Sequence, residues 1–272
     1  VKVAHLDTAH WITNNYNAYG RLFNLVQRRN VALTGSIRLI EHNSAIENAD
    51  LATVLGNTFT MESYTYANKP IYRIPISSPI EYGWQKRDIN AIRHNYLWFG
   101  SAGFVHKGLD LVLELFAGLP DYQLFVCGPL HKEKAFVQEF HCELLETENI
   151  HPVGWVDING AKFKEMLNQC LGIIYPSCAE GGGGSVIDCM RAGVIPVVSY
   201  EASVDVNGNG VTLKDCSLPE MHKAVTRVSD LPSSELEDMA RETWQSASST
   251  HSQASFAQKY KEFVLNVLLQ SD

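Results

Sequence analysis

The sequence lacks the signatures of several large classes of protein. It contains no HExxH run, no Cys/His cluster and no GxSxG segment, so neither a zinc enzyme nor a serine hydrolase of the α/β type is indicated. His94, His106, His131 and His141 show no metal-ligand spacing, and we expect no bound metal. None of the six cysteines forms a CxxC pair, and most lie in apolar runs such as LFVCG, which predicts buried reduced thiols.

Excess positive charge and long apolar runs are also missing. Lys and Arg total 22 against 30 Asp and Glu, a net charge of -8, which disfavours a nucleic-acid binder but leaves room for a local phosphate pocket. No apolar run approaches the roughly 18 residues of a membrane span, and no signal peptide opens the chain. We therefore expect a cytoplasmic protein without an integral membrane segment, and peripheral attachment to a membrane stays compatible with the sequence.

Strand and helix patterns alternate regularly from about residue 96 onward. Short apolar runs predict strands, and segments with apolar residues at helical spacing separate them. The strands are expected at 96–100, 122–128, 171–177 and 194–200, and the helices at 107–119, 131–146 and 160–170. This alternation is typical of a doubly wound α/β domain with a parallel sheet, in which ligands bind at the carboxyl ends of the strands.

The first 95 residues contain fewer predicted strands and helices. Strands are expected at 1–7, 49–56 and 69–77 and a helix at 14–29, which suggests the latter part of a second α/β domain whose beginning is absent. The final helix pattern, 255–269, is expected to dock against that domain. Its apolar face carries Phe256, Tyr260, Phe263, Val264, Val267 and Leu268.

Four consecutive glycines stand inside CAEGGGGSVID, residues 178–188. Because ordered glycine is costly in backbone entropy, such a run predicts either a flexible linker or a close approach to the backbone. It follows an apolar strand and precedes a helix pattern, whereas linkers lie between domains. We therefore interpret it as a turn that binds an anion with free N–H groups and the helix dipole, with tight packing alone as the alternative. No lysine follows the glycines, which excludes a Walker loop.

Two carboxylates frame this turn, Glu180 before the glycines and Asp188 in the helix that follows. A carboxylate beside a bound diphosphate is repulsive unless it serves a hydroxyl group. The pair therefore suggests a ligand with sugar hydroxyls on both sides of its phosphates. For Asp188 the alternative is an acid that is simply favoured near a helix N-terminus.

The same residues resemble a known family. SCAEGGGGSVIDCMRAGVIPVVS (177–199) resembles the PSxxEGxGxxxxEAMAxGxPVV block of the retaining glycosyltransferases of family 4, and FGSAGFVHKGLDLVLELF (99–116) resembles their VGRLxxxKGxxxLLxAF block. The resemblance covers about residues 50–270. It implies the α/β GT-B fold with two doubly wound Rossmann-like domains, the first incomplete. Residues 1–95 would belong to the acceptor-side domain, 96–250 to the nucleotide-sugar domain, and 251–272 to a helix that returns to the first.

The resemblance implies a role for each matching residue. Lys107 would meet the donor diphosphate and stabilise charge on the leaving nucleotide, Glu180 would bind donor-sugar hydroxyls, and Asp188 would bind the ribose. Gly128, Trp155 and Val156 would line the base pocket. The remaining donor-binding positions are Ser101, Gly103, Ser177, Gly181, Gly182, Gly183, Gly184 and Ser185.

Two departures from the family pattern stand out. Asp188 occupies the position of a glutamate and is one methylene shorter. The family's arginine beside the lysine is absent, since the equivalent stretch is Ser101-Ala102-Gly103. This places more of the phosphate charge on Lys107, with Ser101 and His106 as additional donors.

His10, in LDTAHW after the first strand, is the candidate catalytic acid or base of the first domain, with Asp7 and Asn14 as weaker companions. The alternative is a histidine that is only hydrogen-bonded within the protein.

The expected function is transfer of a sugar from a nucleotide diphosphate sugar, a UDP- or GDP-sugar, to a hydroxyl of a glycan, lipid or small-molecule acceptor. The resemblance implies retention of configuration and no metal or other cofactor. The alternatives are a nucleotide-sugar epimerase or phosphorylase on the same scaffold, or a non-catalytic module that binds a nucleotide sugar.

Overall fold

Two parallel β-sheets frame the protein, which the computed structural model describes over residues 1–269, without the side chain of Leu268. Within that range, the larger sheet has six strands in the order β6-β5-β4-β7-β8-β9, and the smaller has three in the order β1-β2-β3. The strands are β1 (Val3–Leu6), β2 (Leu51–Val54), β3 (Ile71–Arg73), β4 (Asn95–Phe99), β5 (Gln123–Cys127), β6 (Ile150–Gly154), β7 (Gly172–Tyr175), β8 (Ile195–Ser199) and β9 (Val211–Leu213).

The strand order of the larger sheet reverses at β4. This strand pairs with β5 on one side and with β7 on the other, so the segments that leave β4 and β7 emerge side by side at the same edge. Such a reversal creates the crevice in which open α/β sheets bind ligands. The four strands expected beyond residue 95 are confirmed, each within a few residues of its predicted bounds.

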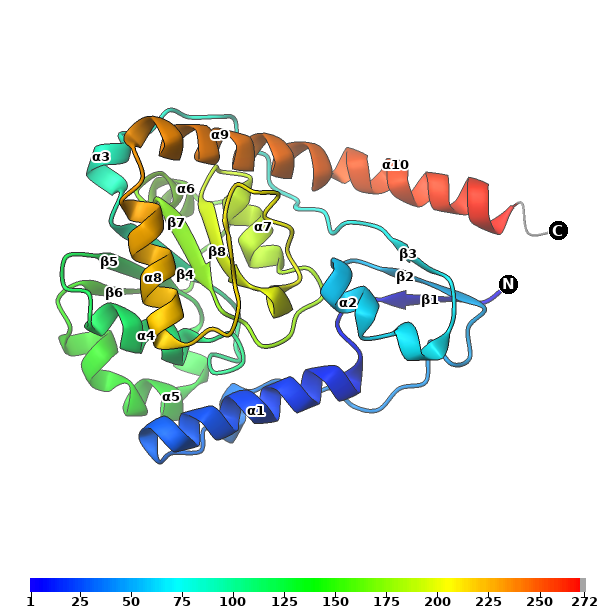
Figure 1. Cartoon of the computed structure of the whole chain (residues 1–272), viewed down its shortest axis with the longest axis horizontal. Helices are drawn as coiled ribbons and strands as arrows, with labels where there is room; N and C mark the ends of the chain where they lie inside the picture. Colours follow the sequence, from blue (N-terminus) through cyan, green and yellow to red (C-terminus); the bar gives the residue numbers. More distant parts are fainter. Residues whose placement is uncertain (270–272) are drawn as a thin grey trace.

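Helices connect and flank these strands (Figure 1). They are α1 (Trp11–Arg29), α2 (Thr58–Glu62), α3 (Ile89–Ile92), α4 (Leu109–Ala117), α5 (Lys134–Glu139), α6 (Ala161–Asn168), α7 (Gly184–Met190), α8 (Leu218–Ser229), α9 (Ser233–Thr250) and α10 (Gln253–Phe263). The helix expected over 131–146 is not continuous, because α5 ends at Glu139 and a π-helical turn covers Cys142–Glu146. Its apolar spacing is kept, since Phe136, Phe140 and Leu144 are all buried.

The larger sheet carries most of the core. Trp98, Tyr96 and Tyr175 are almost fully buried on it, and Leu25 of α1 belongs to the same apolar cluster. Helix α1 therefore packs on the larger sheet although it follows β1 of the smaller one. Ion pairs fix its end there, with Arg28 Nη2 2.5 Å from Asp110 Oδ2 and Arg29 Nε 2.9 Å from Glu114 Oε1.

Helices α9 and α10 run along the opposite side and reach from the larger sheet to the smaller one (Figure 1). The apolar face of α10 contributes Phe263 and Phe256 to a cluster with Leu51 and Ile74 of the smaller sheet. Val264 and Val267 extend this contact, while the Leu268 side chain lies outside the described residues.

All six cysteines are free, and five are buried as expected, but Cys142 is exposed because it lies on the outer side of the π-helical turn. Over residues 1–269, no helix combines the length and apolar character that crossing a bilayer requires.

Candidate active site

The segments that follow β4 and β7 are joined where the sheet order reverses. The Cys178 N–H donates to the His106 carbonyl oxygen at 2.9 Å. His106 Nε2 lies 2.8 Å from the Ala179 carbonyl oxygen and donates to it. These buried contacts hold the residues before the glycine turn against those around Lys107.

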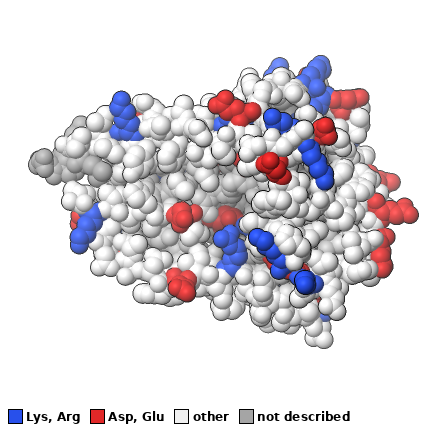
Figure 2. Space-filling model, turned by 180° about the vertical axis from the view of Figure 1, so that it is seen from behind, with Lys and Arg blue, Asp and Glu red and all other residues white. Residues whose placement is uncertain are grey.

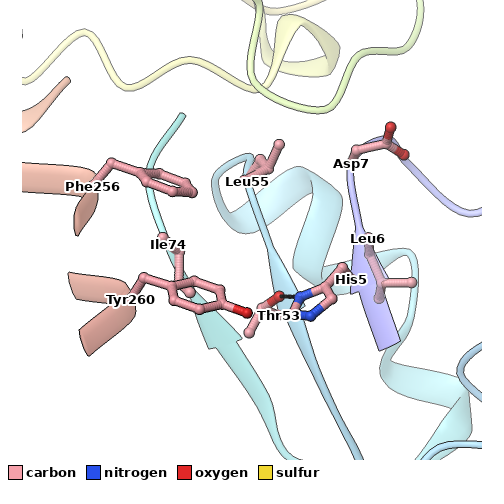
Figure 3. A pocket seen from close by; sticks show the side chains of 8 residues that line it. All are labelled: His5, Leu6, Asp7, Thr53, Leu55, Ile74, Phe256 and Tyr260. Atoms are coloured by element: carbon pink, nitrogen blue, oxygen red, sulfur yellow. Dashed lines mark hydrogen bonds between the residues drawn. The ribbon is translucent and has the colours of Figure 1, made fainter. Parts of the chain in front are cut away.

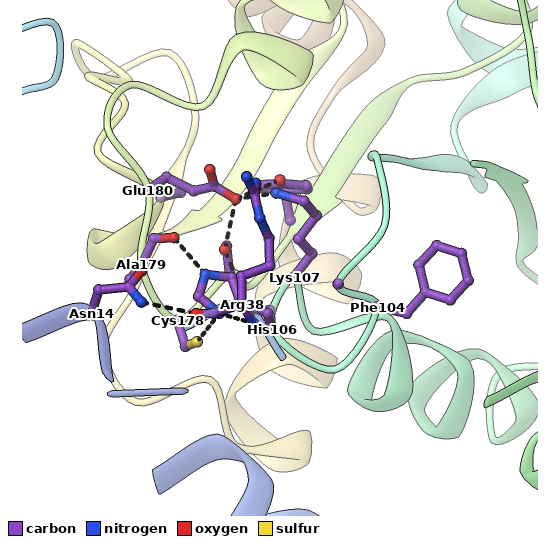
Figure 4. A network of polar contacts seen from close by, with 12 residues as sticks. Asn14, Arg38, Phe104, His106, Lys107, Cys178, Ala179 and Glu180 are labelled. Atoms are coloured by element: carbon purple, nitrogen blue, oxygen red, sulfur yellow. Dashed lines mark hydrogen bonds and ion pairs between the residues drawn. The ribbon is translucent and has the colours of Figure 1, made fainter. Parts of the chain in front are cut away.

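Lys107 and Glu180 form an ion pair at this junction (Figure 4). The Lys107 Nζ atom lies 2.5 Å from Glu180 Oε1, and the lysine side chain is 4% exposed. The same Oε1 accepts hydrogen bonds from Tyr175 Oη at 2.9 Å and Ser177 Oγ at 3.1 Å. Glu180 Oε2 accepts no hydrogen bond from the described residues, so one oxygen is anchored and the other is available to a ligand.

Burial and the charge of Lys107 together determine the protonation of Glu180 and His106. Burial alone would raise the pKa of Glu180, but the Lys107 charge and hydrogen bond outweigh it and the pKa is lowered. Burial lowers the pKa of His106 to about 4, so the imidazole is neutral at pH 7. Its Nε2 donates to Ala179 and its Nδ1 accepts from the Arg38 N–H at 3.4 Å. Contrary to expectation, His106 therefore has no free N–H to donate to a phosphate.

A charged pocket of about 250 Å³ opens beside this ion pair. Its walls come from segments beside both sheets: Asp7, Thr8 and Asn14 follow β1, and residues 38–40 precede β2. From the larger sheet's side, His106 follows β4, and Ala179, Glu180 and Gly181 follow β7. On the face in Figure 2, positive and negative side chains are interspersed around a hollow near the middle.

The glycine turn is approached closely by the protein's own chain at two positions. A Cβ atom at Gly181 would lie 1.9 Å from the Asp7 carbonyl oxygen, and one at Gly183 would lie 2.5 Å from Val204 Cγ2. Tight packing therefore accounts for glycine at these positions. The amides of residues 181–185 nevertheless donate to no acceptor in the described part of the chain, so the anion-binding role stays a prediction.

The residues predicted to line the base pocket lie just after β5 and β6. Gly128 follows β5, where a Cβ atom would meet the Trp98 ring at 3.1 Å. Trp155 is 67% exposed and Val156 is buried. Ser101 is exposed, while Gly103 is buried beneath the side chain of Arg38.

Asp188 lies in α7 and is largely buried outside the charged pocket. Burial raises the pKa of its carboxyl group, and a hydrogen bond with Ser78 and the charge of Arg191 oppose that rise. Its predicted contact with a ribose stays a prediction.

His10 caps helix α1. Its Nδ1 accepts from the Ile12 N–H at 3.4 Å, and its Nε2 lies 3.0 Å from Tyr66 Oη. The ring packs against Tyr64 and does not line the charged pocket. The structure thus favours the hydrogen-bonded alternative, and the catalytic role of His10 stays a prediction.

A second, apolar pocket of about 390 Å³ lies between the smaller sheet and α10 (Figure 3). Leu55, Ile74, Phe256 and Tyr260 supply apolar walls, and His5 Nδ1 forms a hydrogen bond of 2.7 Å with Thr53 Oγ1. Asp7 lines this pocket and the charged one, so the two adjoin at the end of β1.

Sequence reasoning missed two features. Arg38 lines the charged pocket but stands alone in SIRLI, where no motif or periodicity marks it. His141, Cys142 and Glu146 bring three ligand atoms within 4.8 Å of one another, a grouping that could hold a metal ion. All three are exposed and none lines the charged pocket.

The family model "Glycosyl transferases group 1" matches residues 84–243. No curated protein sequence matches the chain. The fold is similar to that of solved glycosyltransferases, which confirms the predicted GT-B type, Rossmann-like α/β architecture.

Three solved structures illustrate the similarity. HepE of Anabaena, in complex with UDP and glucose, has a TM-score of 0.67 and 14% identity over 97% of this chain and 71% of its own. Sucrose-phosphate synthase of Thermosynechococcus elongatus has a TM-score of 0.63 and 16% identity over 84% and 60%. A mutant of S. aureus TarM in complex with fondaparinux, α-GlcNAc-glycerol and UDP has a TM-score of 0.59 and 14% identity over 80% and 45%. The chain thus spans between 45% and 71% of the lengths of these proteins.

Proposed function

Because this chain belongs to the group 1 glycosyl transferases, we propose that it transfers a sugar from a nucleotide diphosphate sugar to a hydroxyl acceptor. The observation that carries the proposal is the buried Lys107–Glu180 ion pair at the reversal of the larger sheet, beside a pocket with room for a ligand. A lysine ammonium suits a phosphate, and the free Oε2 of Glu180 suits a sugar hydroxyl.

In this proposal the protein positions the reactants and stabilises charge. The bond between the anomeric carbon and the diphosphate oxygen breaks, and its electron pair stays with the diphosphate. Lys107 stabilises the negative charge that develops there. The acceptor oxygen bonds to the anomeric carbon, and the acceptor proton passes to the departing diphosphate. Glu180 binds the sugar through Oε2 while Tyr175 and Ser177 hold Oε1 in place.

Retention of configuration is part of the proposal and is supported by the resemblance of residues 99–116 and 177–199 to retaining enzymes. We propose a uridine nucleotide as the first donor to test, since HepE and TarM are each described in complex with UDP. Charge compensation by Lys107 supports binding that does not require a metal ion, and titration in the presence of a chelator checks this.

The acceptor is proposed to enter from the smaller sheet. The apolar pocket adjoins the charged one at Asp7, and its walls include Phe256 and Tyr260. This arrangement favours an acceptor that carries an apolar group, such as a lipid-linked hydroxyl, over a purely polar glycan.

Product analysis with labelled donors tests the proposed reaction. The protein is incubated with UDP- and GDP-sugars and with polar or lipid-linked acceptors, and the anomeric configuration of any product is read by NMR. Labelled sugar on the acceptor in its original configuration supports the proposal. A donor sugar with changed configuration and no transfer indicates an epimerase. Cleavage of the substrate that requires free phosphate indicates a phosphorylase. Saturable binding without turnover indicates a non-catalytic module.

A further inference from the structure

Arg38 belongs to the segment between β1 and β2, yet its side chain lies at the ion pair of the larger sheet. It lines the charged pocket together with Glu180 and His106. Figure 4 shows it beside Lys107 and Glu180. An arginine from the smaller-sheet side therefore reaches the place where a donor diphosphate is proposed to bind.

The backbone of Arg38 is fixed by buried side chains on both sides. Its N–H donates to His106 Nδ1 at 3.4 Å, and its carbonyl oxygen accepts from Asn14 Nδ2 at 2.8 Å. His106 and Asn14 are each 2% exposed. Two residues earlier, the Ser36 carbonyl oxygen accepts from the His106 N–H at 3.0 Å. These contacts fix the Arg38 backbone beside the charged pocket, while Arg38 itself is exposed.

The side chain of Arg38 occupies space that Gly103 leaves empty. A Cβ atom at Gly103 would lie 2.8 Å from Arg38 Cγ and 2.9 Å from Arg38 Cδ. Glu133 joins the two segments that carry these residues, because its carboxylate accepts from the Gly103 N–H and from the Ser36 hydroxyl. The small residues after β4 thus make room for an arginine that comes from another part of the chain.

The guanidinium of Arg38 has no protein partner among residues 1–269. It makes no hydrogen bond or ion pair there, and Asp7, which also lines the pocket, is not paired with it. Glu180 is already matched by Lys107. A planar guanidinium with free donors that faces a pocket is suited to a phosphate group, which it can bind through two parallel hydrogen bonds.

We propose that Arg38 is the second cationic ligand of the donor diphosphate and replaces the arginine that the stretch 101–103 lacks. The inference rests on the proposed function. Lys107 would hold the diphosphate from the larger sheet and Arg38 from the segment before β2, so that donor binding bridges the two sheets.

Calorimetric titrations with UDP, GDP, ADP, uridine and inorganic pyrophosphate test this assignment. The variants are Arg38→Gln, which removes the charge, and Arg38→Lys, which keeps it without the planar fork. Arg227→Gln is the matched control, because Arg227 is an exposed arginine of α8 that forms no ion pair within residues 1–269, and its loss changes the net charge equally. Circular dichroism and the melting temperature establish that each variant is folded.

We expect Arg38→Gln to weaken binding of the preferred nucleoside diphosphate and of pyrophosphate by about tenfold or more, the scale for loss of a hydrogen bond between charged groups. Uridine affinity should change by less than about twofold, and Arg38→Lys should recover part of the loss. If Arg38→Gln binds the diphosphate within about twofold of the unmodified protein, this inference is wrong and the proposed function still stands. If the unmodified protein binds no nucleoside diphosphate, the proposed function fails, and this inference fails with it.

Discussion

The two sheets of this protein differ in what they contribute to the site. The six-stranded sheet has a large core with fully buried Trp98 and Phe116, and it carries Lys107 and Glu180 where its strand order reverses. The three-stranded sheet has small apolar clusters, one of which includes Phe263 of α10. The larger sheet thus provides rigid support for the ion pair, whereas the smaller sheet adds Asp7 and Arg38 from flanking segments.

Hydrogen bonds around the charged pocket join the segments that flank the smaller sheet to those of the larger sheet. Arg21 Nη2 of α1 donates to the Pro176 carbonyl oxygen at 2.8 Å, and Asn17 Nδ2 donates to that of Cys178 at 2.9 Å. On the far side of the glycine turn, Thr60 Oγ1 and Ser203 Oγ share a hydrogen bond of 2.7 Å. The position of the smaller sheet relative to Glu180 therefore depends on these polar contacts together with a small apolar cluster of Ala9, Phe59 and Ala179.

Truncation of one phenylalanine in each part tests the contrast in packing. Phe116→Ala, in the larger core, should lower the free energy of unfolding by about 3–5 kcal/mol. Phe263→Ala, in the small cluster with α10, should cost less, about 2 kcal/mol, because fewer buried side chains surround it. Urea unfolding followed by two spectroscopic probes measures both values. Equal losses would contradict the claim that the two cores differ.

Lowering the pH should reduce the free energy of unfolding through protonation of His106. The pKa of His106 in the folded protein is about 4, below the ordinary value of 6.5. Between these pH values the unfolded chain binds a proton that the folded chain does not, so the free energy of unfolding falls as the pH drops from 6.5 to 4. The loss should amount to about 3 kcal/mol, and full stability returns above pH 6.5.

Two histidine variants isolate this effect from other groups that titrate in the same range. His106→Gln should flatten the dependence of unfolding free energy on pH between 4 and 6.5, while His131→Gln, at an exposed position, should leave it unchanged. An identical pH profile for His106→Gln and the unmodified protein would refute the assignment.

A smaller loss of unfolding free energy is expected from a substitution at the contact between the glycine turn and the segment after β1. Gly181→Ala places a methyl group within 1.9 Å of the Asp7 carbonyl oxygen, so the β1 side must shift. We expect a loss of about 1–3 kcal/mol in unfolding free energy, together with weaker ligand binding. Gly83→Ala is the control, since its added Cβ would have no atom within 4 Å in the described chain apart from its own sequence neighbours. Equal stability of the two variants would argue against close contact at Gly181.

The sequence predicted the larger sheet better than it predicted the pocket. Strand–helix alternation located β4, β5, β7 and β8, and the motifs around Lys107 and Glu180 placed two residues that meet at 2.5 Å although 73 positions separate them. Such motifs are local and recur with fixed spacing. Arg38 could not be found in this way, because its position depends on tertiary contacts with Asn14, His106 and Gly103.

Other predictions failed or stay open for similar reasons. The apolar period over 131–146 predicted burial correctly but not the change of helical pitch after Phe140, which spacing alone does not encode. The position of His10 after a strand makes it a catalytic candidate, yet its neighbours Tyr64 and Tyr66 come from a segment more than 50 residues away and engage its ring. The roles of Trp155, Val156 and Asp188 depend on a ligand and stay predictions.

The central claim is that a nucleoside diphosphate occupies the pocket beside Lys107 and Glu180. Titration calorimetry of the unmodified protein with UDP, GDP and ADP, compared with Lys107→Ala and the exposed-lysine control Lys132→Ala, tests it most directly. We predict saturable binding of at least one nucleotide, unchanged in Lys132→Ala and weakened by about tenfold to a hundredfold in folded Lys107→Ala. Absence of binding for all three nucleotides, or equal binding by Lys107→Ala, would contradict the claim.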